Sequence, residues 1–149
     1  MTNLHNWFEC KVKYIKTGED GKDKKVSESY MIDAASYTEA EAKIYEIMEQ
    51  IVSGPFKVSA IKGSNVSEII ESDNTGADKY FKVKVSIIDA DEATGKERRS
   101  NQYVLTHGED IHEALALTHE NFSTYVVPFE IAQISDTNII EVIPHKEEK

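Results

Sequence analysis

The chain has one cysteine, three prolines and no long apolar segment, and each of these scarcities excludes a class of protein. A single cysteine, Cys10, excludes an intramolecular disulfide framework and a zinc site built from cysteines. No run of residues approaches the roughly 18 apolar residues of a membrane-spanning helix. The opening MTNLHNWFECKVKY also lacks the apolar segment of a signal peptide. We therefore expect a cytoplasmic protein that does not enter a membrane.

The usual motifs of enzymes and cofactor sites are also missing. No GxSxG, no GxGxxG and no phosphate-binding glycine loop occurs. Three histidines, His107, His112 and His119, lie among acids in the second half, but solvated helix histidines explain them more simply than a metal site. Cys10 alternates with core positions, so we expect a buried, unreactive thiol. The sequence predicts a protein without catalytic residues, cofactor or metal.

What the chain does contain is an internal repeat. A shift that places Trp7 on Tyr80 brings WFECKVKYI over YFKVKVSII. The same shift aligns further pairs, namely Tyr30 with Tyr103, Pro55 with Pro128, Phe56 with Phe129 and Asn65 with Asn138. With one extra residue, two Gly-Lys turns also coincide. We predict two repeats, residues 5–71 and 79–145, joined by a linker of mostly turn-forming residues.

Each repeat has the pattern of two strands, a helix and two more strands. In the first repeat, alternation over 7–15 and 26–32 indicates half-buried strands around the polar loop GEDGKDKK. Apolar residues at helical spacing over 37–52 indicate a helix capped by Ser36 or Thr38. Residues 56–61 and 66–70 then suggest a hairpin that turns at 62–65.

The second repeat follows the same pattern, with a helix from about Ile111 to Tyr125 that Thr106 or Asp110 caps. The predicted fold class is α+β. It is an internal duplication of a β-β-α-β-β unit, with antiparallel sheets, one helix per repeat and a pseudo-twofold arrangement. We favour one compact domain built from both repeats.

Charge is distributed unevenly along the chain, whose formal net charge is −10. Residues 7–25 and 79–99, the first hairpin of each repeat, hold 12 basic and 8 acidic residues, a charge of +4. The remainder holds 5 basic and 19 acidic residues, a charge of −14. An acidic body therefore carries two related, mildly basic hairpins.

Strand alternation gives these hairpins an outward face that carries an aromatic residue followed by lysines, once in each repeat. Aromatic rings stack on unpaired bases and lysines attract phosphates. We therefore expect a non-enzymatic protein that binds single-stranded nucleic acid. The expected binding residues are Trp7, Lys11, Lys13, Tyr80, Lys82, Lys84, Arg98 and Arg99.

Two other interpretations stay open. Lysines on exposed strands also serve solubility and protect strand edges. The acidic pairs Glu39/Glu41 and Glu46/Glu49 fit a solvated helix face, or a surface that binds another protein or mimics DNA. The second hypothesis is therefore an acidic protein-interaction or inhibitor module. The choice between DNA and RNA and the oligomeric state are not determined by the sequence.

Several segments together resemble a small family of unknown function from gut anaerobic bacteria and their phages and mobile elements. These segments are WFECKVKY, the Gly-Lys hairpin, YTEAEA and PFKVSAIKGSNVSEII. The resemblance covers most of the chain and implies a context of phage or mobile-element biology, without site residues. The duplicated layout is also similar to that of the Whirly and Pur-repeat single-strand binders. Their repeats place four strands before a helix, an order that residues 56–125 share across the linker.

Overall fold

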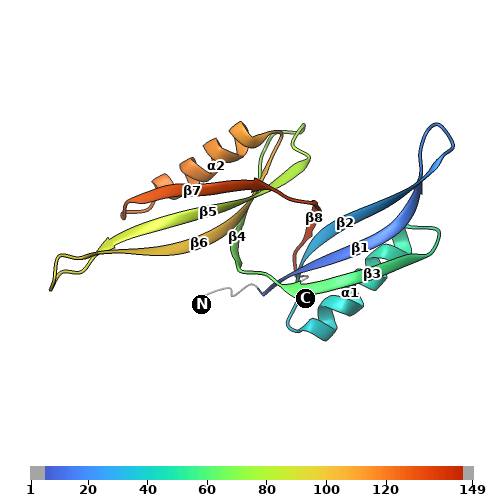
Figure 1. The fold of residues 1–149 in the computed structure, drawn as a ribbon, viewed down its shortest axis with the longest axis horizontal. Coiled ribbons are helices and arrows are strands. Elements are labelled where there is room, and N and C mark those ends of the chain that lie inside the picture. The colour runs from blue at the N-terminus through green and yellow to red at the C-terminus, as the bar shows by residue number, and fades with distance from the viewer. Residues whose placement is uncertain (1–5, 146–149) are drawn as a thin grey trace. The chain divides into compact units, whose positions relative to one another are not determined.

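The structure, a computed structural model, describes residues 6–145 and contains in that range two helices and eight strands in two four-stranded sheets (Figure 1). The chain divides into two compact units. Unit 1 comprises the residues up to Asn65 together with those from Asn138 onward, and unit 2 comprises Val66–Thr137. The α+β class and the duplication are confirmed, because each unit has one four-stranded sheet and one helix.

Unit 1 is a sheet with the strand order β3-β1-β2-β8. Its elements are β1 (Trp7–Thr17), β2 (Asp23–Asp33), α1 (Tyr37–Ile51), β3 (Phe56–Gly63) and β8 (Ile139–Ile143). β1 runs antiparallel to β2 and β3, whereas β8 runs parallel to β2. α1 begins after Ser36, whose hydroxyl oxygen accepts a hydrogen bond from the Glu39 N–H at 3.1 Å, as expected for an N-cap.

Unit 2 repeats this arrangement with the strand order β4-β6-β5-β7. Its elements are β4 (Val66–Ile70), β5 (Lys79–Ala90), β6 (Glu97–Gly108), α2 (Ile111–Ser123) and β7 (Phe129–Asp136). β4 runs parallel to β6, and the other two pairings are antiparallel. Asp110 is the N-cap of α2, and its carboxylate accepts a hydrogen bond from the Glu113 N–H at 2.9 Å.

The helix of each unit covers one sheet face, and the core lies between them. In unit 1 the buried helix residues Ala40, Ile44 and Met48 pack with strand residues that include Phe8 and Cys10. In unit 2 the equivalent buried helix residues are Ala114, Thr118 and Phe122. Phe8 and Phe81 are both buried, and Phe56 and Phe129 are both half-buried against their cores. These matched positions agree with the predicted duplication.

The two Gly-Lys turns are also confirmed. Gly21 and Gly95 have φ angles of 78° and 69°, and no other described residue has a positive φ. Glycine takes this left-handed conformation without the steric cost of a Cβ atom. The first hairpins of the two repeats therefore turn at equivalent residues.

The predicted hairpin of β3 with β4 is wrong, because β4 pairs with β6 of unit 2 and β8 pairs with β2 of unit 1. Each repeat thus gives its last strand to the other unit. Only Ser64 and Asn65 lie between β3 and β4, and a two-residue hairpin needs residues with positive φ. Neither residue has one. The units therefore differ from the repeats 5–71 and 79–145, whose first residue, 5, lies outside the described part of the chain.

The predicted match of Tyr30 with Tyr103 also needs correction. Tyr30 pairs with Cys10 and points into the core of unit 1, whereas Tyr103 pairs with Lys84 on the opposite sheet face of unit 2. The extra residue in the second Gly-Lys hairpin shifts the register by one position. A shift of one residue moves a strand side chain to the other face.

Candidate nucleic-acid interface

The sheet face of unit 1 that lies opposite α1 carries five lysines on three adjacent strands. Lys11 and Lys13 lie on β1, and the register places Lys57 opposite Lys13, Lys62 opposite Glu9 and Lys25 opposite Ile15. We call these residues the unit 1 lysine set: Lys11, Lys13, Lys25, Lys57 and Lys62. Lys11 is half-buried and the others are exposed. None of the five forms an ion pair with a residue that the structure describes.

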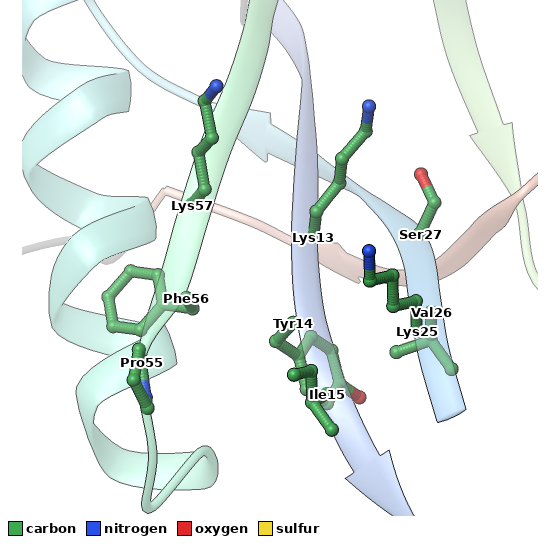
Figure 2. Close-up of a pocket in the computed structure, with 9 residues that line it drawn as sticks. All are labelled: Lys13, Tyr14, Ile15, Lys25, Val26, Ser27, Pro55, Phe56 and Lys57. Atoms are coloured by element: carbon green, nitrogen blue, oxygen red, sulfur yellow. The ribbon is translucent and has the colours of Figure 1, made fainter. Parts of the chain in front are cut away.

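Three members of this set surround a cavity of about 520 Å³, with one lysine from each of three adjacent strands (Figure 2). Lys13 comes from β1, Lys25 from β2 and Lys57 from β3. The remaining lining residues are Tyr14, Ile15, Val26, Ser27, Pro55 and Phe56. The registers place the side chains of Ile15 and Ser27 on the lysine face, and those of Tyr14, Val26 and Phe56 on the helix face. The cavity thus combines an apolar surface with three ammonium groups.

The Tyr14 phenol, on the helix face of the sheet, is held in its neutral form. The Tyr14 hydroxyl donates a short hydrogen bond to the Glu28 carboxylate. Burial, followed by this hydrogen bond and the charge of Glu28, raises the pKa of Tyr14 to about 12. Glu28 pairs with the core residue Val12, so its carboxylate lies with the phenol on the helix face and not beside the lysines of the opposite face.

The equivalent face of unit 2 carries fewer free charges. Lys82 and Lys84 are half-buried on β5, and together with Tyr103, Gln133 and Ser135 they line a hollow of about 200 Å³. The Lys82 ammonium lies 5.1 Å from the centre of the Tyr103 ring, within the range of a cation–π interaction. Lys82 and Lys84 are therefore brought together with an aromatic ring, as the sequence predicts, but the ring belongs to Tyr103.

The two predicted arginines of unit 2 are already paired. Arg99 forms an ion pair with Glu130 at 2.8 Å, and Arg98 lies 3.4 Å from Asp91. The hydrogen bond and the charge of Glu130 raise the pKa of Arg99. Exposed ion pairs are weak, so they do not prevent phosphate contacts. The Arg99–Glu130 pair lowers the positive charge of the face that carries Lys82 and Lys84, whereas Arg98, opposite Asp89, lies on the other side of β6.

The prediction that Trp7 and Tyr80 are exposed is wrong. Their side chains are only 4% and 7% exposed. Trp7 is the first residue of β1 and Tyr80 the second of β5, at a strand end where residues on both sheet faces are buried, as Met31 and Ile32 show for unit 1. The Tyr80 ring stacks on His107 of the neighbouring strand, with ring centres 4.4 Å apart. Neither ring is available to an unpaired base in this structure.

The remaining candidates have structural roles. Cys10 is fully buried, as predicted, and burial raises the pKa of its thiol to about 12. His119 packs on Phe129 with ring centres 5.2 Å apart, as Tyr45 packs on Phe56 at 5.6 Å in unit 1. Among the described residues, no group of three or more histidines, cysteines or acids has the geometry of a metal site.

Sequence reasoning missed Lys25, Lys57 and Lys62. Strand alternation places each of them on a predictable side of its own strand. Only the register of β3 against β1 brings Lys57 beside Lys13, however, and that pairing joins segments more than forty positions apart. Long-range register of this kind leaves no local signal in the sequence.

The fold and these faces define a duplicated α+β protein whose two sheets each present lysines on the face opposite the helix. The model of a domain family of unknown function, DUF4494, matches residues 6–145, and the chain belongs to this family. This confirms the predicted membership of a family of unknown function. No curated protein and no solved structure matches the chain. Neither described helix is long and apolar enough to cross a membrane.

Proposed function

We propose that this protein is a non-enzymatic binding protein that holds single-stranded nucleic acid on the outer faces of its sheets. The observation that carries the proposal is the unit 1 lysine set, five cations on one sheet face without ion-pair partners among the described residues. Lysines that neutralise phosphates release condensed counterions, which drives binding at low salt. The net charge of −10 does not oppose this, because the local potential governs the encounter.

A single strand suits these faces better than a duplex. Unpaired bases expose apolar surfaces that can stack on side chains, whereas a duplex keeps its bases stacked inside. The outer faces offer such surfaces at Ile15, which is 57% exposed, and at the half-buried Tyr103. We therefore assign to Tyr103 of unit 2 the base-stacking role that we expected for Trp7 and Tyr80.

The test is the binding of a labelled oligothymidylate, followed by fluorescence anisotropy at several salt concentrations. We expect salt-dependent binding, and weaker binding of a duplex of the same length. Lys11→Ala and Lys84→Ala should each flatten the dependence of log K on log salt by about 0.7. Lys16→Ala is the matched control, because Lys16 lies on the same strand with its side chain on the opposite face.

Two results would contradict the proposal. One is the absence of binding at low salt. The other is an equal loss of affinity for Lys16→Ala and Lys11→Ala, which would show that only the overall charge matters.

A second candidate rests on the exposed face of α1. Glu41, Glu46 and Glu49 are exposed there, beside Tyr45 and Ile51, which are 42% and 56% exposed. A mixed acidic and apolar helix face fits a basic partner protein. This acidic interaction module becomes the preferred function if the oligonucleotide does not bind.

A further inference from the structure

We infer that the cavity between β1, β2 and β3 of unit 1 is a pocket for one nucleotide of the bound strand. Its apolar lining would take the unpaired base, and Lys13, Lys25 and Lys57 would hold the phosphate (Figure 2). The inference rests on the proposed function and assigns it a specific subsite. Unit 2 has no equivalent set of lysines.

The size and lining of the cavity fit a small ligand. Its volume of about 520 Å³ lies in the range of about 300–1,000 Å³ that is typical of ligand pockets. Such pockets combine mostly apolar walls with a few polar groups. Here Ile15, which is 57% exposed, provides an apolar side chain on the same sheet face as the lysines, and Pro55 also lines the cavity. The Ser27 hydroxyl adds a hydrogen-bonding group beside Lys13.

The positive charges around the cavity favour an anionic ligand. Lys13 and Lys57 are direct cross-strand neighbours, and like charges in that position destabilise a sheet. Lys25 adds a third positive charge from the other side of β1, and no acidic residue lines the cavity. An anionic group between the three ammonium groups would remove this repulsion. An apolar body with an attached anion is the chemistry of a nucleotide.

Unit 2 shows that the fold itself does not require these lysines. The strand registers place Glu130 where unit 1 has Lys57, and Arg99 where unit 1 has Lys25. These two residues form the ion pair at 2.8 Å. Ser86 stands at the position of Lys13, and its hydroxyl donates a hydrogen bond to the Asn101 amide oxygen at 3.0 Å. The same scaffold therefore folds with a neutralised cluster, and unit 1 retains an open one.

The test uses two nucleotide probes, thymidine 5′-monophosphate and a labelled oligothymidylate, with the full-length protein, and inorganic phosphate serves as a third probe without a base. Lys57→Glu introduces into unit 1 the acid that unit 2 has at this position. We expect it to weaken binding of both nucleotide probes about tenfold, through one lost phosphate contact and one new repulsion. Lys57→Gln should have a smaller effect of the same sign. Glu130→Lys is the matched reciprocal variant and should not weaken binding.

Lys82→Ala, at a lysine outside the cavity, is the fourth variant. All four variants and the wild-type protein are compared by circular dichroism and melting temperature, because an exposed substitution should change stability little. If the oligonucleotide binds but Lys57→Glu acts no more strongly than Lys82→Ala, the pocket is overturned and the proposed function stands. Equal affinity for inorganic phosphate and the nucleotide also overturns the pocket, because its apolar lining then contributes nothing. If wild-type protein binds neither nucleotide probe, both proposals fail.

Discussion

Units 1 and 2 arrange the same elements around cores of different chemistry. Ile32 and Ile44 are buried in the core of unit 1, whereas Thr106 and Thr118 occupy the equivalent positions of unit 2 with their hydroxyl oxygens 2.7 Å apart. Thr118 donates its only hydroxyl hydrogen to the Ala114 carbonyl at 2.8 Å, so Thr106 donates to Thr118. The fold thus accepts a polar pair in the core when both partners change together.

The surfaces of the two units also differ, in whether their charged side chains form ion pairs. At the positions equivalent to Lys25 and Lys57, unit 2 pairs Arg99 with Glu130, whereas unit 1 leaves Lys13, Lys25 and Lys57 unpaired around a cavity. Since both units have the same strand arrangement, the fold does not explain the open lysines. Because the fold does not require these unpaired lysines, their presence in unit 1 points to a role in function.

The largest expected effect tests the exchange of the last strands. Ile139 and Val66, the first residues of β8 and β4, are 4% and 5% exposed. Ile139→Ala should cost about 2–5 kcal/mol and should lower hydrogen-exchange protection first in unit 1. Val66→Ala should cost less and should act first on unit 2. Protection lost in the opposite units would show that the strands pair within their own repeats.

The next effect concerns the buried threonine pair. Thr118→Val leaves the Thr106 hydroxyl without its acceptor, and an unsatisfied buried hydroxyl costs about 1–3 kcal/mol. The double variant with Thr106→Val should recover most of that loss, because replacing both partners with apolar groups is nearly neutral. Urea unfolding of the single and double variants measures the coupling. Additive losses would mean that the two hydroxyl groups do not interact.

The helix caps should have equal effects in both units. Asp110→Ala and Ser36→Ala each remove a side-chain acceptor for a backbone N–H in the first turn, at a cost of about 1 kcal/mol. Thermal unfolding followed by circular dichroism would detect this loss. A much larger effect of either substitution would reveal a role beyond capping.

The smallest effect is a difference in acid sensitivity. Hydrogen bonds from Asn74, Ser72 and the Glu109 N–H lower the pKa of Glu113 below its ordinary value of 4.5, and Lys43 chiefly lowers that of Glu39. A depressed pKa stabilises the fold above the ordinary value, and this contribution is lost as pH falls through the lower folded value. Glu113→Gln and Glu39→Gln should each reduce the loss of stability below pH 4.5.

The contributions of Glu39 and Glu113 to stability should differ in their sensitivity to salt. Glu39 faces the charged Lys43 at 3.0 Å, whereas the side-chain partners of Glu113 are neutral. Added salt should therefore weaken the contribution of Glu39 more than that of Glu113. Equal salt sensitivity in acid unfolding would contradict the assignment of Lys43 as the main cause.

Local features of the sequence were sufficient to predict much of this structure. Ser36 and Asp110 were among the candidate caps, Gly21 and Gly95 marked the turns, and alternation placed Lys11 and Lys84 on outward faces. Each of these features depends on a few neighbouring residues. Helix capping, turn conformation and strand alternation are all decided at that range.

The strand exchange and the cavity could not be predicted in the same way. Val66–Ile70 has the same strand pattern whether it pairs with β3 or with β6, so alternation does not choose its partner. The burial of Tyr80 involves a side chain of the neighbouring strand, His107, and alternation within one strand does not show such a contact. Lys25 and Lys57 become neighbours of the same cavity only through pairing across β1.

The contrast between the two units is tested most directly by mapping the backbone amide shifts in nuclear magnetic resonance during titration with oligothymidylate. The predicted result is that the largest changes fall on Lys13, Lys25 and Lys57 of unit 1, with smaller changes at the equivalent residues Ser86, Arg99 and Glu130 of unit 2. These changes should shrink as salt is added. Equal or larger changes in unit 2, or changes confined to the exposed face of α1, would contradict the account.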